Sequence, residues 1–231
     1  MTELHIHANA ANANFTATGR TCTNLALHHL FAACRFSARV REIEFANAGQ
    51  PFGSFWEEIL QNSLGVATLS VAALESYANE MYFEGAVLRR GVNSIASVEL
   101  ANLVDRESIL KKYSLALSIS VGKKLDFGVT EVQNADALIR LRNAVVHFRP
   151  EWFDEQDKHR KLSNILQHKF EPSTFLASEP VFPRAWASHS FTVWALKTTI
   201  AFVDHYYLEA GLQSVLLPFR TQLSDLSSVA L

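Results

Sequence analysis

Apolar residues recur every three or four positions along most of this chain, which is the spacing of one face of an α-helix. The longest such pattern, in residues 54–88, contains Trp56, Leu60, Val66, Leu74, Tyr77 and Met81 with small residues between them. Comparable patterns predict helices at residues 23–47, 131–149, 156–169 and 186–211, and two shorter helices within residues 93–121. Strand-like alternation of useful length is missing, so the sequence predicts an all-α fold, an antiparallel bundle of about five to six helices.

Hydroxyl residues and glycines mark where these helices begin and end. Thr23 and Ser54 precede apolar segments and are candidate N-caps, because their hydroxyl oxygens can accept a hydrogen bond from the first helical turn. Gly122 is expected to close the second of the two shorter helices. Gly85 or Gly91 is expected to end the long helix that starts after Ser54.

These patterns divide the chain into three segments. Residues 1–50 are expected to form an N-terminal extension with one helix packed on the bundle, residues 51–216 the helical domain, and residues 217–231 a C-terminal tail. Residues 1–21 are small and polar, so we expect them to be irregular or to hold a short strand near residues 4–6. Residues 170–185 contain three prolines and are expected to be a loop.

The composition fits a folded domain with a large core. Hydrophobic residues make up 48% of the 231 residues and charged residues 19%, so the chain can bury enough apolar surface to fold. The formal net charge of −2 argues against a protein held to nucleic acid by bulk charge. It leaves room for a nuclease that contacts a few phosphates through a local basic patch.

The sequence favours the reducing cytoplasm as the location of the protein. Its two cysteines, Cys22 and Cys34, form neither a disulfide framework nor a Cys-x-x-Cys metal site. The first residues lack the basic region and the continuous apolar region of a signal peptide. The longest apolar run is too short to span a bilayer, so no membrane partner is expected.

A group of polar side chains interrupts an otherwise apolar helix in the stretch LIRLRNAVVHFRPEW, residues 138–152. Asn143 and His147 are one helical turn apart and share a face, while Arg142 lies about 100° to one side and is long enough to reach the same groove. Arg149 follows two residues after His147. Pro150 is expected to end the helix, because proline disfavours helical geometry in the residue before it.

These residue types suit phosphoryl chemistry that needs no metal ion. Arginine presents a forked donor to phosphate, histidine can move a proton near neutral pH, and asparagine can orient either the histidine or the substrate. The sequence places no pair of Asp or Glu residues beside them to hold Mg²⁺. RNA cleavage is the simplest such reaction, because the RNA supplies its own nucleophile, the 2′-hydroxyl, and the protein only shifts protons and stabilises the phosphate.

The sequence RNAVVH, from Arg142 to His147, resembles the Arg-x4–6-His signature of the HEPN superfamily (higher eukaryotes and prokaryotes nucleotide-binding), whose most typical form is Arg-Asn-x-x-x-His. The flanking sequences ALIRL and FRP also resemble the motif helix of that family. Upstream, VAALESYANEMY at residues 71–82 resembles the family's LE-aromatic-x-N helix. The resemblance extends over residues 54–211 and leaves the first 50 residues uncovered.

The resemblance implies a homodimeric helical bundle whose two motif helices face each other across a composite cleft. Many members are metal-independent endoribonucleases of toxin–antitoxin, phage-defence or RNA-processing systems, with an antitoxin or regulatory protein as a partner and no cofactor. Carried over to this chain, Arg142 would stabilise the scissile phosphate, His147 would act as general base or acid, and Asn143 would position them. The products would carry a 2′,3′-cyclic phosphate and a 5′-hydroxyl.

One position departs from a pattern within the family. Toxin members that pair with a nucleotidyltransferase antitoxin often have a tyrosine two residues after the histidine, where this chain has Arg149. Modification of that tyrosine is therefore not expected here. Arg149 is instead a candidate second contact to the substrate phosphate.

Several of these residues also admit a structural role. Glu75 and Asn79, one turn apart, can line the cleft and bind substrate, or they can form a polar stripe that closes the bundle. Arg142 can form a surface ion pair with a glutamate, and His147 can be a cation at a helix C-terminus. The segment DKHRKL, residues 157–162, is a basic patch facing RNA or, more commonly for such segments, a solvated helix face.

Two other kinds of function stay open. The chain can be a catalytically inactive HEPN-like module that binds RNA, a nucleotide or a protein partner. It can also be a plain helical interaction protein whose motif is structural. The histidines at positions 5, 7, 28 and 29 have no cluster of Cys, Asp or Glu around them in the sequence, so no metal site is expected.

Overall fold

The structure, a computed structural model, describes residues 23–84, 99–100, 102–152 and 157–227. The helices are α1 (Ala26–Ala46), α2 (Phe55–Glu84), α4 (Ile109–Val121), α5 (Thr130–Val146), α6 (Asp157–Leu166), α7 (His189–Glu209) and α8 (Arg220–Ser227). Three short helical turns are η1 (Thr174–Leu176), η2 (Val181–Ala185) and η3 (Leu217–Phe219). None of the described residues lies in a strand, which confirms the predicted all-α helical bundle.

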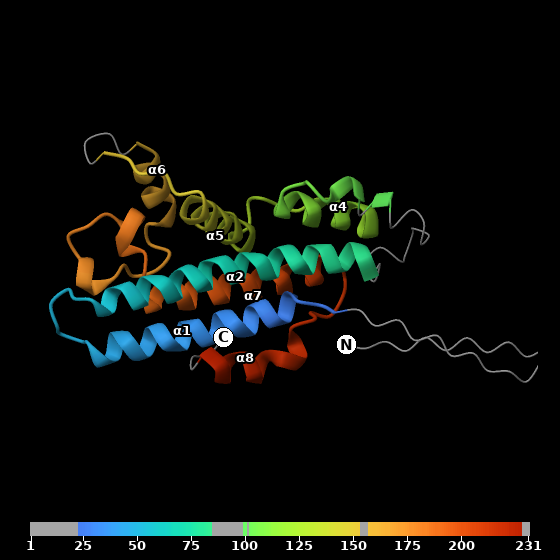
Figure 1. Cartoon of the computed structure of the whole chain (residues 1–231). Coiled ribbons are helices and arrows are strands. Elements are labelled where there is room, and N and C mark those ends of the chain that lie inside the picture. The colour runs from blue at the N-terminus through green and yellow to red at the C-terminus, as the bar shows by residue number, and fades with distance from the viewer. Residues whose placement is uncertain (1–22, 85–98, 101, 153–156, 228–231) are drawn as a thin grey trace, which may run out of the picture.

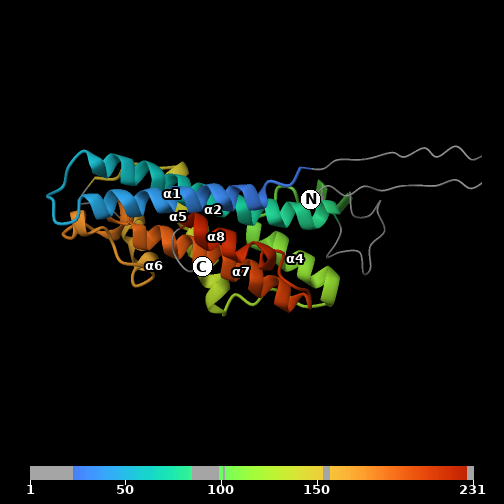
Figure 2. The same ribbon diagram turned by 90° about the horizontal axis from the view of Figure 1, so that it is seen from below.

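The long helices α2 and α7 form the centre of the bundle. Helix α1 turns back on α2 through a short connection, and both contact α7 (Figure 1). Helices α4 and α5 lie on the side of α2 that is opposite to α1. Helix α8 folds back against α1, as the view from below shows (Figure 2). The end of α5 and helix α6 therefore project at one edge of the bundle, above α2 in Figure 1.

The predicted apolar stripe of α2 faces the core. Val66 and Leu74 are fully buried, and Trp56, Tyr77 and Met81 are buried as well. Burial of a large apolar side chain stabilises the fold by about 1.5–3 kcal/mol relative to exposure. Helix α5 also turns an apolar face to the core, because Val132, Ala135, Leu138 and Leu141 are buried.

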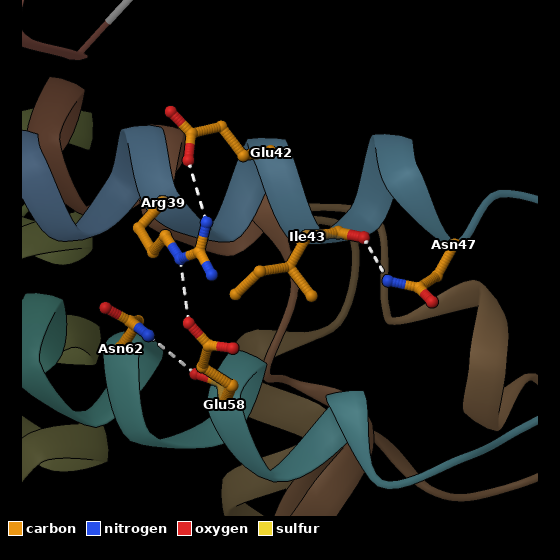
Figure 3. A network of polar contacts seen from close by, with 6 residues as sticks. All are labelled: Arg39, Glu42, Ile43, Asn47, Glu58 and Asn62. Atoms are coloured by element: carbon orange, nitrogen blue, oxygen red, sulfur yellow. Dashed lines mark hydrogen bonds and ion pairs between the residues drawn. The ribbon is translucent and has the colours of Figure 1, made fainter.

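Polar contacts align α1 with α2 at the closed end of their hairpin (Figure 3). The Arg39 guanidinium donates from Nε to Glu58 Oε1 over 2.7 Å and from Nη1 to Glu42 Oε2 over 3.0 Å. The Asn47 side-chain amide donates to the Ile43 carbonyl at the end of α1 over 2.8 Å. The Arg39 side chain is half exposed, so these ion pairs orient the hairpin more than they stabilise it.

The two candidate N-caps, Thr23 and Ser54, have different outcomes in the structure. Helix α1 begins at Ala26, and Thr23 does not cap it; the Ala26 N–H donates instead to Glu80 Oε1 of α2, over 3.0 Å. Helix α2 begins directly after Ser54, with Glu57 and Glu58 in its first turn as predicted. A carboxylate from a neighbouring helix thus replaces the local hydroxyl cap at α1.

Two predicted irregular regions contain helical structure. The predicted loop at residues 170–185 holds the short turns η1 and η2. The predicted C-terminal tail holds η3 and α8, and α8 inserts the fully buried Leu223 into the core. Arg220 at the start of α8 forms an ion pair with Asp204 of α7. Helix α8 is short, and the tertiary contacts rather than the local pattern stabilise it.

Other predictions have mixed outcomes. Gly122 closes α4 in the left-handed conformation, with φ of 71°, as predicted. The irregular or stranded segment at residues 1–21, the end of α2 at Gly85 or Gly91, and most of the first short helix in residues 93–121 lie outside the described residues. In the part of the chain that the structure describes, no helix combines the length and apolar character needed to cross a bilayer.

Candidate functional site

The C-terminal end of α5 carries the Arg-Asn-x-x-x-His motif. Helix α5 ends at Val146, three residues before the predicted end, and His147 occupies the C-cap position with φ of −107° and ψ of 38°. The His147 N–H still donates to the Asn143 carbonyl, over 3.0 Å. Pro150 has no N–H to donate to the Val146 carbonyl and its ring would clash there, which explains the early end. His147 and Arg149 are consequently exposed on a non-helical segment.

The Arg142 side chain points toward α2. Its Nη2 lies 3.9 Å from Glu75 Oε2, and 22% of the side chain is exposed. Its Nε is buried and has no hydrogen-bond partner among the described residues. The ion pair is long, so Arg142 is held loosely at the seam between α5 and α2.

Asn79 lies one turn after Glu75 on α2 and contacts a different helix. Its Oδ1 accepts a hydrogen bond from Lys112 Nζ of α4, over 2.9 Å. Lys112 is only 1% exposed, whereas Asn79 is exposed at the surface. Glu75 and Asn79 therefore form a polar stripe along α2 that contacts one cation from α5 and one from α4.

The two charged residues of the motif point in different directions within one chain. Arg142 lies within α5, whereas His147 is the C-cap residue after its last turn. Arg142 contacts α2, while His147 lines a hollow on the side of α6. Asn143 is exposed, and its side chain has no hydrogen-bond partner among the described residues. A single chain thus brings Arg142 to Glu75 and His147 to Arg149, but does not join Arg142 and His147 in one pocket.

The hollow beside His147 has a volume of about 310 Å³ and lies between the end of α5, helix α6 and the turn η2. We call it the α5–α6 hollow. Its polar lining consists of Arg140, His147, Arg149, Glu151, Lys158, His159 and Lys161. Its apolar lining consists of Ala144, Leu162, Ile165 and Phe182.

Positive charge dominates the polar lining of the α5–α6 hollow. Arg140 is paired, because its Nε donates to Asp136 Oδ2 over 2.7 Å. Arg149, Lys158 and Lys161 have no ion pair among the described residues. Cations that outnumber the carboxylates on one concave surface attract an anionic ligand.

The single carboxylate of the hollow is bound to the first turn of α6. Glu151 Oε2 accepts hydrogen bonds from the backbone N–H groups of Lys158 and His159, both over 3.2 Å. The free N–H groups of a helix N-terminus and its dipole favour a negative charge at this point. Glu151 acts here as an anion supplied by the protein itself.

His159 is the most deeply buried polar residue of the hollow, with 6% exposure. Its Nε2 lies 3.2 Å from the Arg149 carbonyl oxygen, and since a carbonyl can only accept, Nε2 must donate. Its ring stacks on Phe148, with 5.6 Å between ring centroids. Its Nδ1 is buried and has no partner among the described residues. The imidazole ring is therefore fixed in place by Nε2 and by stacking, while Nδ1 makes no hydrogen bond to the described residues.

The sequence predicts the residues from α6 only as a basic segment, DKHRKL, and not as neighbours of the motif. Lys158 and Lys161 are three positions apart and share one face of α6, and this spacing within DKHRKL was the available signal. The sequence could not show that this face meets the end of α5, because the approach of two helices depends on tertiary packing rather than on a local pattern. Lys158, Arg160 and Lys161 are exposed, as the expectation of a solvated helix face requires, and Lys158 and Lys161 also line the α5–α6 hollow.

Candidate metal ligands do not gather in the described part of the chain. There, no group of three or more His, Cys, Asp or Glu side chains is close enough to hold an ion. His29 approaches the Ser76 hydroxyl from Nδ1 over 3.4 Å, and His28 packs on Phe31. His5 and His7, which were also considered as metal ligands, lie outside the described residues.

No family model, no curated protein and no solved structure matches this chain. A function must therefore be inferred from its own residues, from their geometry, and from the resemblance of its motif.

Proposed function

We propose that this chain is an endoribonuclease of the HEPN type that cleaves RNA without a metal ion. The observation that supports this most is the position of His147, exposed at the end of α5 beside the unpaired cations Arg149, Lys158 and Lys161. An imidazole in that setting can exchange protons with a substrate whose phosphates the cations attract.

The reaction needs one proton to be removed and one to be supplied. A base takes the proton of the RNA 2′-hydroxyl, the oxygen attacks the adjacent phosphorus, and the bond to the 5′-oxygen of the next nucleotide breaks. An acid protonates that leaving oxygen, which gives a 2′,3′-cyclic phosphate and a 5′-hydroxyl. His147 serves as the base or the acid, and Arg142 and Arg149 stabilise the anionic phosphorane.

Two copies of the chain would supply the groups that one copy holds apart. In a symmetric dimer through α5, Arg142 of one copy can face His147 of the other, which gives two clefts with one arginine and one histidine each. The His147 that has taken the 2′-hydroxyl proton can then deliver it to the leaving oxygen. Glu75 would orient Arg142 through the 3.9 Å ion pair, and Asn143 would contact the substrate or the partner's motif from its exposed position. The dimer itself is part of the proposal.

The test is cleavage of a mixed tRNA and mRNA pool by purified protein in the presence of EDTA. Wild type is compared with His147→Ala, Arg142→Ala and, as a matched control, Lys197→Ala, which removes an exposed cation of α7. We expect cleavage by wild type and the control, and a loss of at least about 100-fold in both motif variants. Equal cleavage by all four proteins would reject the motif as the catalytic site.

A second candidate function is an inactive HEPN-like module that binds RNA, a nucleotide or a protein partner. The observation that favours it is the engagement of Arg142 with Glu75 and the burial of its Nε. A guanidinium tied to the bundle must break that contact before it can reach a phosphate. Absence of cleavage by wild type across the whole pool would favour this candidate.

A further inference from the structure

A second hollow, of about 350 Å³, lies between α4, the connection from α4 to α5, and the first half of α5. We call it the α4–α5 hollow. Its apolar lining consists of Ile109, Leu110, Phe127 and Ile139, and its polar lining of Ser108, Lys111, Ser114 and Asp136. None of the residues that the proposed function uses lies in this hollow.

The lining of the α4–α5 hollow carries no excess charge. Lys111 Nζ lies 2.7 Å from Glu107 Oε2, and Asp136 Oδ2 lies 2.7 Å from Arg140 Nε. Phe127 forms one wall of the hollow and is 56% exposed. The hollow is therefore suited to an uncharged, apolar occupant rather than to an ion.

Trp152 is an apolar side chain that the single chain leaves uncovered, with 79% exposure. The segment that carries it is held on α6. The Glu151 carboxylate accepts hydrogen bonds from the N–H groups of Lys158 and His159, both over 3.2 Å, and the Arg149 carbonyl accepts one from His159 Nε2 over 3.2 Å. Trp152 is thus presented from an ordered segment, which lowers the entropy cost of docking it.

We propose that Trp152 of one copy docks in the α4–α5 hollow of a second copy, and that the reciprocal contact forms at the other end of the dimer. This docking rests on the dimer of the proposed function. It adds the contact that fixes how the two copies are aligned along α5.

The two partners of this contact lie at opposite ends of α5. Helix α4 lies beside the start of α5, whereas the segment after Val146 leaves at its other end (Figure 1). Trp152 is therefore remote from the hollow of its own chain. Reciprocal facing of Arg142 and His147 requires a two-fold axis that crosses α5 between Ala144 and Val145, and such an axis exchanges the two ends of the helix.

The same axis sets the level at which Trp152 meets the partner's helix. Residues equally far from the axis in sequence come opposite each other, so Trp152 comes opposite the level of Ala137. Asp136 and Ile139, which line the hollow, lie next to this level. The segment after Val146 is not helical, so it can span up to about 3.3 Å per residue instead of about 1.5 Å. Trp152 can therefore also reach the α4 side of the hollow.

The chemistry of the hollow fits an indole. Phe127 and Ile139 offer an aromatic and an aliphatic surface to the ring. The Ser108 hydroxyl does not cap α4, so it is an acceptor for the indole N–H. The volume is at the lower end for sites that hold a small molecule, which suits one ring system. Tryptophan is also among the residues that dominate the energy of protein interfaces.

The first experiment measures the dissociation constant of the dimer by sedimentation equilibrium, without any RNA. Trp152→Ala should raise this constant at least about 100-fold, because the contact is lost twice in each dimer. Phe45→Ala is the matched control, since it removes an 85% exposed aromatic ring of α1 that does not line the hollow. It should change the constant less than about threefold. Equal effects of the two substitutions would overturn the docking.

A substitution in the hollow tests where Trp152 docks. Phe127→Ala removes an exposed wall and should raise the dissociation constant about tenfold. The double variant should be less than about twofold weaker than Trp152→Ala alone, because both changes remove the same contact. Fully additive losses would show that the two side chains do not meet. Thermal unfolding of each variant confirms that the chain still folds.

Tryptophan fluorescence tests the contact in the unmodified protein. Trp56 and Trp186 are buried and Trp194 is half-buried, so Trp152 is the most accessible of the four to a soluble quencher. We expect acrylamide quenching to decrease when the protein is concentrated from monomer to dimer, and this decrease to be absent in Trp152→Phe. A dimer in which Trp152 is as accessible as in the monomer would overturn the docking. A protein that stays monomeric at all concentrations would overturn it as well.

RNA cleavage by the same preparations separates this docking from the proposed function. A dimer with protected Trp152 that cleaves no RNA would support the docking and reject the nuclease. A protein that cleaves RNA while Trp152 stays accessible in the dimer would reject the docking alone.

Discussion

Lys112 is a buried amino group that depends on one neighbour, the Asn79 side chain at 2.9 Å. Asn79→Ala removes the acceptor and leaves a nearly inaccessible donor without its partner. We expect the free energy of unfolding to fall by about 1–3 kcal/mol, measured by urea denaturation. Asn79→Asp keeps an acceptor oxygen at this position and should retain most of the stability.

A second variant separates this structural role from the substrate-binding role predicted for Asn79. Lys112→Met removes the buried amino group, and Asn79→Ala in that background should then cost less than about 0.5 kcal/mol, because the interaction is already gone. Full destabilisation in the Lys112→Met background would show that Asn79 stabilises the fold by another contact.

Cys34 is a fully buried thiol, and desolvation raises its pKa to about 12. The thiolate is the reactive form, so at pH 8 the native protein should be alkylated at Cys34 at least about 100-fold more slowly than the urea-unfolded chain. Peptide mapping by mass spectrometry distinguishes this site from Cys22. Equal rates in native and unfolded protein would contradict the burial.

The raised pKa of Cys34 also makes the free energy of unfolding depend on pH. The folded-state pKa of Cys34 lies above its ordinary value, so its contribution to stability is fully present below the ordinary thiol pKa and is lost as pH rises toward about 12. Cys34→Ser lacks this titration. The difference in unfolding free energy between wild type and Cys34→Ser should therefore shrink between about pH 9 and pH 11.

At the scale of single elements, the start of α7 is the most clearly capped. The Ser188 hydroxyl accepts a hydrogen bond from the Phe191 N–H over 3.1 Å and donates to the Glu171 carbonyl over 2.8 Å. Ser188→Ala removes both bonds at a buried position, and we expect a loss of about 1–2 kcal/mol in thermal or urea unfolding. Lys197→Ala, at an exposed position in the middle of α7, should be neutral to slightly stabilising.

The elements that the sequence predicted well are those with a long apolar stripe. Leu74 in α2 and Leu138 in α5 belong to such stripes, and both are fully buried. The sequence predicted less well where the outcome depends on distant residues. Thr23 lies two residues before the N-cap position, which Leu25 occupies, and Glu80, far along the chain, supplies the acceptor for the first turn of α1. Helix α8 is stabilised by contacts of Leu223 and Arg220 with the bundle, and no local sequence pattern predicts these contacts.

The candidate site divides in the same way. The motif from Arg142 to His147 is visible in sequence, because helical periodicity fixes which of its residues share a face. The residues that surround the motif cannot be predicted from the sequence, because Glu75 comes from α2, and Lys158 and His159 come from α6. The early end of α5 at Val146 also escaped prediction by three residues, since the effect of Pro150 reaches back to the carbonyl four positions before it.

At the scale of the whole molecule, the arrangement of the helices exposes the end of α5 at an edge of the bundle. Helices α1 and α7 pack on other faces of α2, α8 packs on α1, and none of the three covers the segment after Val146 (Figure 1). Val146 at the end of α5 and Phe148 after it are about half exposed, and Trp152 is 79% exposed. Apolar side chains around a polar motif are what an interface between two copies requires.

The geometry of one chain gives the proposed dimer a specific test. Arg142 contacts Glu75 of α2 while His147 lines the α5–α6 hollow, so a working cleft would draw Arg142 from one copy and His147 from the other. Arg142→Ala and His147→Ala proteins, each inactive alone, are co-refolded in equal amounts. Half of the dimers should then be mixed, and each mixed dimer has one of its two clefts intact, so about a quarter of the wild-type activity should return.

The control is the same mixture without refolding, in which subunits cannot exchange and no activity should appear. Size-exclusion chromatography with light scattering establishes that the refolded mixture is dimeric. A dimeric mixture that stays inactive, while refolded wild type regains cleavage, would show that each copy uses its own Arg142 and His147. The ion pair of Arg142 with Glu75 would then have to open within a single chain before the guanidinium could meet the substrate.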